Sequence, residues 1–131
     1  MDSYAHALTT GDLNTLDAIC DPQVVRYDRM AMASKGLDSL KRVIALTREM
    51  YPDFKVTIDE GLYVGDHAVV RWTITGTNTG PGIFAPTGKS FKVSGLSLSR
   101  FVDGKLVEER AAYDRLDMLQ QLGFQVTPPA K

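Results

Sequence analysis

Residues 54–78, FKVTIDEGLYVGDHAVVRWTITGTN, decide the fold, because apolar residues recur at alternate positions along much of this stretch. A period of two is typical of a β-strand with one buried face. Gly65-Asp66 divides the stretch, and a glycine at the first position of a two-residue turn suits a type II′ hairpin. We therefore expect an antiparallel hairpin formed by residues 54–64 and 67–78.

The rest of the second half continues this pattern. Residues 91–102, FKVSGLSLSRFV, and residues 105–114, KLVEERAAYD, read as two more strands joined at Asp103-Gly104, which is a strong hairpin signal. RLDMLQQLG, residues 115–123, then predicts a short helix that ends at a glycine.

The first half has a helical period instead. Asp12 is a candidate N-cap for a short helix that carries Leu16 on its apolar side. A longer helix is expected from Leu37 to Tyr51, before Pro52, with an extended segment at residues 23–28. Helices followed by a four-strand antiparallel meander and one extra strand indicate an α+β fold, with the helices on one face of a bent sheet.

Composition excludes several classes of protein. The 131 residues suffice for one domain, with 44% hydrophobic and 24% charged residues and a net charge of −1. No basic run or long apolar run appears, so we expect neither a nucleic-acid partner nor a membrane span, and a cytoplasmic location. The single cysteine, Cys20, is expected to be a buried apolar side chain. We expect one domain over residues 1–123 and a disordered tail over 124–131.

Residues 80–90, GPGIFAPTGKS, look like a phosphate-binding loop. That motif needs four residues between its glycines, whereas five separate Gly82 from Gly88, and a helix must follow it. Because the following residues alternate as a strand, the stretch is instead interpreted as a long connection. Ile83 and Phe84 could form a lid over an apolar ligand, or the connection could be a plain packed loop.

Three segments resemble the SnoaL-like polyketide cyclase family of the nuclear transport factor 2-like superfamily. They are AVVRWTITGTNTG (68–80), APTGKSFKVSGLSLSRF (85–101) and DGKLVEERAAYDRLDMLQQLG (103–123). The resemblance implies a cone-shaped fold: a curved, mostly antiparallel sheet, three N-terminal helices, a short C-terminal helix and an apolar pocket. It also implies a homodimer paired through the sheets, no metal or organic cofactor, and a general acid/base at the position of Asp114.

The chain departs from the family pattern at three positions. Tyr27 stands where many members have histidine, Asn78 replaces another histidine, and Arg110 replaces a tryptophan. With Trp72 and Phe84, these three residues form the candidate substrate pocket. Because the departures change polar groups near the pocket, the substrate cannot be carried over.

Several candidates have alternative interpretations. Asp114 could simply cap the last helix. Arg110 and Glu108 share strand parity with Asp114, so they could face the pocket, or they could form an outward salt bridge. Arg71 resembles an epoxide hydrolase arginine, but Thr73 stands where a second carboxylate is expected.

Two functional hypotheses follow. The first is an enzyme that performs general acid/base chemistry, by aldol cyclisation, isomerisation or hydration, on a hydrophobic, carbonyl-bearing, polyketide-like molecule. The second is a non-catalytic ligand-binding or dimerisation module on the same fold. His6 and His67 have no partners at metal-ligand spacing, so no metal site is expected.

Overall fold

The computed structural model describes residues 1–28 and 31–130 of the chain. In chain order its elements are α1 (Asp2–Thr10), α2 (Thr15–Ile19), β1 (Cys20–Asp28), β2 (Ala31–Lys35), α3 (Leu37–Met50), β3 (Lys55–Val64), β4 (His67–Thr77), β5 (Ser90–Val102), β6 (Lys105–Tyr113) and α4 (Arg115–Gln121).

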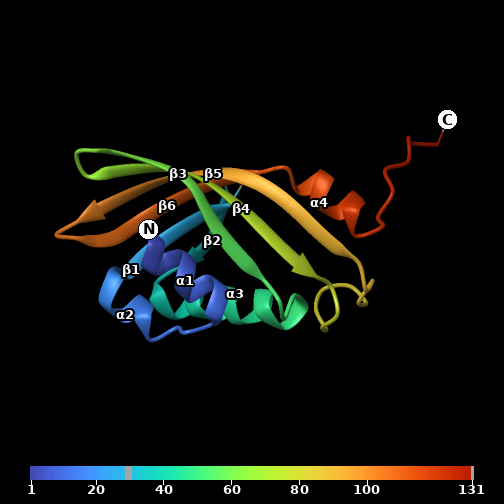
Figure 1. Cartoon of the computed structure of the whole chain (residues 1–131), viewed down its shortest axis with the longest axis horizontal. Coiled ribbons are helices and arrows are strands. Elements are labelled where there is room, and N and C mark those ends of the chain that lie inside the picture. Colours follow the sequence, from blue (N-terminus) through green and yellow to red (C-terminus); the bar gives the residue numbers. More distant parts are fainter. Residues whose placement is uncertain (29–30, 131) are drawn as a thin grey trace.

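One curved sheet organises the molecule. Its strand order is β2-β1-β6-β5-β4-β3, and neighbouring strands are antiparallel except β1 and β6, which are parallel. The sheet arches over α1, α2 and α3, and α4 lies at one end (Figure 1). This arrangement confirms the expected α+β class, with three helices before the meander and a short one after it. We call the face toward the helices the inner face.

The tight turns follow from local backbone chemistry. Gly65 has φ 59°, which a residue with a β-carbon rarely adopts, and it joins β3 to β4. Asp103 and Gly104 both have positive φ, 51° and 78°, as a type I′ turn between β5 and β6 requires. Since Ser90 begins a strand and not a helix, the phosphate-loop interpretation of residues 80–90 is excluded.

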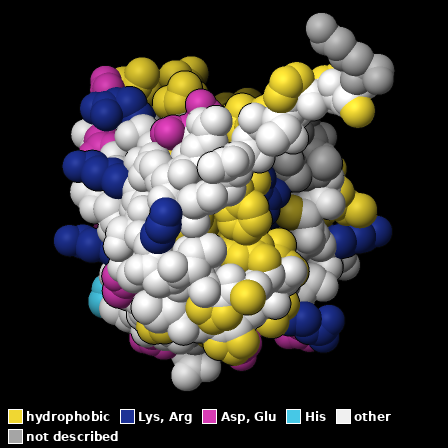
Figure 2. Space-filling view, turned by 90° about the vertical axis from the view of Figure 1, so that its right-hand side faces the viewer, with side chains coloured by type: hydrophobic (Ala, Val, Ile, Leu, Met, Phe, Trp, Pro, Cys, Tyr) yellow, Lys and Arg dark blue, Asp and Glu magenta, His cyan; other side chains and the backbone are white. Residues whose placement is uncertain are grey.

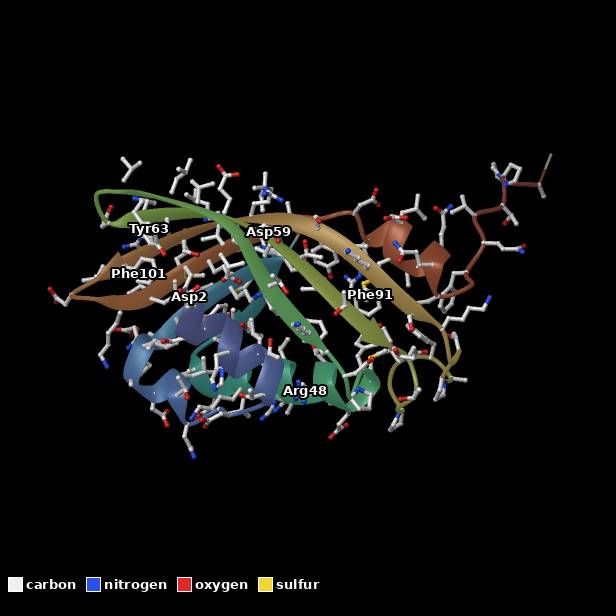
Figure 3. The ribbon with its side chains drawn as sticks, viewed as in Figure 1. Asp2, Arg48, Asp59, Tyr63, Phe91 and Phe101 are labelled. Atoms are coloured by element: carbon white, nitrogen blue, oxygen red, sulfur yellow. The ribbon has the colours of Figure 1, made fainter. Side chains whose placement is uncertain are left out.

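Buried apolar side chains and hydrogen bonds from Arg48 hold the helices together beneath the inner face of the sheet. Leu40 and Ile44 of α3 are buried in one cluster with Leu16, Val24 and other apolar side chains. Arg48 donates hydrogen bonds to the Leu8 carbonyl at 3.3 Å and the Phe54 carbonyl at 3.2 Å, which joins the end of α1 to the chain before β3 (Figure 3).

Two local expectations need correction. β2 was missing from the expected strands, because AMASK is short and carries little β-branched or aromatic content. The second helix begins at Thr15 with Asn14 at its N-cap, and Asp12 instead accepts a hydrogen bond from the Thr15 hydroxyl at 3.1 Å.

Candidate active site

A cavity of about 700 Å³ lies between the inner face of the sheet and helices α1, α3 and α4. Its volume falls within the range of small-molecule sites, roughly 300–1,000 Å³. Most of its wall is apolar, with Leu8, Ile44, Phe54, Val70 and Ile74 among the lining side chains. The cavity therefore suits a hydrophobic ligand.

The mouth of the cavity is formed by two segments far apart in sequence. Ile83 and Phe84 come from the connection between β4 and β5, and Phe124 follows α4. The rings of Phe84 and Phe124 meet edge to face, with centroids 4.9 Å apart. Figure 2 shows hydrophobic side chains gathered around a hollow on this side of the molecule.

A buried ion pair lies where β1 and β6 meet. Arg26 Nε donates to Glu109 Oε1 at 2.9 Å, and the two residues are register partners on neighbouring strands. Burial alone would lower the pKa of Arg26, but Glu109, by its charge and hydrogen bond, together with Tyr4 and Asp28 outweighs it and holds that pKa above its usual value. Arg26 therefore stays charged although it lines an apolar cavity.

Tyr4 of α1 lines the same part of the cavity and is 5% exposed. Burial raises the pKa of its hydroxyl well above the usual value, the Glu109 charge raises it further, and the nearby Arg26 charge and hydrogen bond partly oppose the rise. Tyr4 therefore keeps its proton at neutral pH and can donate it in a hydrogen bond.

Asp28 is the second carboxylate among the described residues that line the cavity. Its Oδ1 atom is buried and has no hydrogen-bond partner in the described part of the chain. A buried acceptor without a partner is costly, so a ligand group that donates a hydrogen bond or a proton would be favoured there.

Trp72 lies in the wall formed by β4 and β5. Its indole Nε1 donates to the Ser97 hydroxyl at 2.7 Å, and its ring meets Tyr113 edge to face at 5.8 Å. Gly95 lies beside the indole: a β-carbon at this position would be 2.4 Å from Trp72 Cη2 and 2.7 Å from the Ala112 carbonyl oxygen. The absence of a side chain at position 95 therefore gives the indole the space that it occupies beside Gly95.

The structure brings only part of the predicted site together. Of the candidate pocket residues, Trp72 and Phe84 line the cavity. Asp114 does not: it is exposed, and its Oδ1 accepts a hydrogen bond from the Asp117 amide at 2.9 Å. This is the N-cap geometry of α4, so the expectation that Asp114 faces the pocket is corrected in favour of the capping alternative.

Tyr27 and Arg110 also lie outside the cavity lining. The Arg110 guanidinium stacks 4.0 Å from the centre of the Tyr27 ring, and its Nε is 3.1 Å from Glu108 Oε1. These contacts match the outward alternative, because Arg26 and Glu109, which alternate with these residues, face inward.

Asn78 has a structural position instead of a pocket position. It is fully buried, its side-chain oxygen accepts from the Thr87 amide at 2.7 Å, and its side-chain nitrogen donates to the Met50 carbonyl at 3.4 Å. Asn78 therefore joins the two ends of the connection that carries Phe84 to each other and to the end of α3.

Sequence reasoning missed Tyr4, Arg26, Asp28, Ser97 and Glu109. For Ser97 a signal existed, since it shares strand parity with buried Val93 and Phe91 and is therefore a polar residue at an inward position. For Glu109 the signal was hidden by a bulge at Val107, which changes which residues of β6 face inward.

The histidines do not form a metal site. His67 Nδ1 lies 2.7 Å from Asp66 Oδ1 at a hairpin turn, and His6 is exposed on α1. In residues 1–28 and 31–130 no three histidine, cysteine or acidic side chains converge.

None of the helices in this part of the chain is long and apolar enough to cross a membrane.

A curved sheet closed by helices around an apolar cavity is the nuclear transport factor 2-like fold. Solved structures with similar folds support this assignment. TsrD from Streptomyces laurentii is 26% identical with a TM-score of 0.83, over 94% of this chain and 91% of that one. IdmH from Streptomyces antibioticus, proposed to be a polyketide cyclase, is 26% identical with a TM-score of 0.80, over 94% and 97%. A Catenulispora acidiphila protein described with a ketosteroid isomerase-like fold is 22% identical with a TM-score of 0.81, over 97% and 95%.

The family follows from the sequence match. The model of the SnoaL-like polyketide cyclase family matches residues 1–122, so the chain belongs to that family. Among proteins with curated descriptions, none matches this chain.

Proposed function

We propose that this protein is a cofactor-independent enzyme that performs general acid/base chemistry on a hydrophobic, carbonyl-bearing, polyketide-like small molecule. Family membership supports the class of substrate, and the apolar cavity supports its hydrophobic character. The observation that carries the chemistry is the Asp28 carboxylate, which has a buried oxygen without a partner among the described residues.

Asp28 is better suited than Glu109 to act as the base. Both carboxylates line the cavity, but Glu109 is engaged with Arg26 at 2.9 Å. The Glu109 oxygen that accepts from the guanidinium is therefore not free to meet a ligand proton. Asp28 also interacts with the Arg26 charge, but its Oδ1 has no hydrogen-bond partner in the described part of the chain and can therefore meet a ligand C–H.

In the proposed reaction Asp28 removes a proton from the carbon next to a ligand carbonyl. The C–H electron pair moves to form an enolate, and the proton stays on Asp28. In an aldol closure the enolate carbon then attacks a second carbonyl carbon of the same molecule, and the new alkoxide takes the proton back. In an isomerisation Asp28 returns the proton to a different carbon. Neither route requires a redox group.

Tyr4 is the candidate donor to the enolate oxygen. Its high pKa keeps the hydroxyl protonated, and Arg26, which lacks any acceptor, can only donate to the tyrosine oxygen. The tyrosine hydrogen is therefore available to a ligand. A donor aimed at developing negative charge in a water-poor site is an effective source of catalysis.

Epoxide hydrolysis is disfavoured by the position of Arg71. Its side chain is half exposed and lies 3.6 Å from Asp59 and 3.5 Å from Glu60, on the face of the sheet opposite the cavity.

The non-catalytic alternative predicts that the cavity binds a ketone without moving its protons.

The proposal is tested with para-ethylacetophenone in D₂O, by following the loss of its acetyl methyl protons in NMR spectra. The wild-type protein should accelerate the exchange. Asp28→Asn should reduce the rate by about 10² or more, because it keeps the shape of the side chain and removes the base.

Asp114→Asn is the matched control and also tests the catalytic role expected from the family resemblance. If the Asp114→Asn variant exchanges the ketone protons at the wild-type rate, Asp114 acts only as a helix cap. The reverse result, a loss with Asp114→Asn and none with Asp28→Asn, would overturn the assignment of Asp28. A wild-type protein that binds the ketone without accelerating exchange would favour the non-catalytic alternative.

A further inference from the structure

We infer that the Ser97 hydroxyl is a second anchor for the ligand, which donates a hydrogen bond to a ligand oxygen far from the reacting carbon. The inference rests on the proposed function and narrows its substrate class. The bound molecule should carry at least two oxygen functions, separated by an apolar segment.

The Ser97 hydroxyl acts as a hydrogen-bond acceptor, but its donor capacity is not used within the described residues. Its oxygen accepts from Trp72 Nε1 at 2.7 Å, and indole nitrogen can only donate, so the direction of this bond is fixed. The serine hydrogen must then point elsewhere. Within the described residues the Ser97 hydroxyl donates to no acceptor, although the residue is only 5% exposed and lines the cavity.

The acceptor bond also makes Ser97 a better donor. A hydroxyl that accepts a hydrogen bond becomes polarised, and its own hydrogen binds an acceptor more strongly. The indole packs in turn against the Tyr113 ring, and Ser97 itself lines the cavity, so its hydrogen can be directed to an acceptor there. A carbonyl or ether oxygen of a ligand is the group that this arrangement would recognise.

The register of the sheet relates Ser97 to Asp28. Asp28 on β1 is opposite Ala111 on β6, and Ala111 is opposite Ser97 on β5. The three residues therefore form one row across the strands, with about 10 Å between the outer two backbones, since strands lie about 4.8 Å apart. Ala111 itself is buried in the core, whereas Asp28 and Ser97 at the two ends of the row both line the cavity.

A ligand that uses both anchors would lie along this row. One carbonyl would be near Asp28 and Tyr4, where the proton is moved, and another oxygen would be near Ser97. An extended ring system with oxygen at both ends has this shape. A hydrocarbon with a single carbonyl would satisfy one anchor and leave the other unused.

Two probes of nearly the same shape test the inference: para-diacetylbenzene, with a carbonyl at each end, and para-ethylacetophenone, with one. Trp72 is the only tryptophan of the chain, so its indole N–H gives a single side-chain NMR signal, next to Ser97. The dissociation constant of each probe is measured from the shift of this signal. The wild-type protein should bind the diketone roughly 2- to 12-fold more tightly, the range of one net hydrogen bond.

Ser97→Ala should remove this preference and leave the affinity for the monoketone unchanged. Ser99→Ala is the control, because Ser99 is a buried serine of the same strand and lies outside the cavity lining. It should keep the wild-type preference.

A Ser97→Ala protein that still prefers the diketone would overturn the inference, as would a wild-type protein that binds both probes equally. In either case the proposed function would stand if Asp28→Asn abolished proton exchange. A wild-type protein that binds neither probe would reject both the inference and the proposed function.

Discussion

Glu109 is a buried carboxylate whose charge is balanced, in the described part of the chain, by Arg26 alone. Replacing Glu109 with leucine would leave the guanidinium without its ion-pair partner, with Asp28 as a charge that no ion pair joins to it. We expect Glu109→Leu to lower the free energy of unfolding by about 3–5 kcal/mol, measured by urea denaturation. The double variant Arg26→Met/Glu109→Leu removes both charges and should recover most of this loss. Equal losses in the single and double variants would contradict the electrostatic explanation.

Cys20 gives a pH-dependent prediction. Burial raises the pKa of its thiol from the usual 9.0 to about 11, and the Glu109 charge adds to the rise. Between these values the folded state holds a proton that the unfolded state has lost, so stability falls as pH increases from about 9 to about 11. At about 1.4 kcal/mol per pKa unit, the thiol contributes on the order of 3 kcal/mol to this fall.

The measurement compares the wild-type protein with Cys20→Ala by urea denaturation across that pH range. The variant is expected to be less stable near neutrality but to lose less stability at high pH. Parallel pH profiles for the two proteins would show that the thiol does not titrate differently on folding.

At the scale of elements, the sequence predicted the parts whose backbone chemistry is local. Gly65 and the Asp103-Gly104 pair marked both hairpin turns, and the helical period located α3 to within one residue of its end. The candidate site was harder, because its residues depend on which strand face turns inward. The bulge at Val107 changes that parity inside β6, so Glu109 and not Glu108 reaches the cavity. The local sequence does not predict this bulge.

The connection between β4 and β5 and the residues after α4 give a prediction about the proposed lid over the cavity. Phe84 and Phe124 meet edge to face at the cavity entrance, and an aromatic pair contributes about 0.5–1.5 kcal/mol beyond its buried area. We expect Phe84→Ala and Phe124→Ala each to weaken binding of para-diacetylbenzene, and the double variant to lose less than the sum, as measured by Trp72 NMR titration. Val126→Ala, an exposed position of the same tail, is the control. Unchanged affinity in Phe84→Ala would reject the lid and leave a plain packed loop.

At the scale of the whole molecule, the outer face of the sheet carries an exposed apolar patch, which consists of Leu62, Val69, Leu96 and Leu98. Val69 is the register partner of both Leu62 and Leu98, so these side chains adjoin across three strands. Contiguous apolar patches on a soluble protein commonly mark interaction sites. We propose that a second copy of the chain covers this patch, which gives the homodimer expected from the family resemblance.

Analytical ultracentrifugation at micromolar concentration tests the dimer. The wild-type protein should sediment as a dimer and Leu98→Asp as a monomer, because a carboxylate in the centre of the interface would lose its hydration. Thr75→Asp, in the polar half of β4, should remain dimeric. A monomeric wild-type protein would refute the proposal.

The missing side chain at position 95 has a consequence for how the cavity could change in the course of evolution. Because a β-carbon there would collide with the Trp72 indole, even alanine would push the largest side chain of the wall toward the ligand space. Gly95 is not among the residues that line the cavity. One methyl group at a position that no ligand contacts could therefore shift the preference from bulky to small substrates, while every chemical group of the site stays the same.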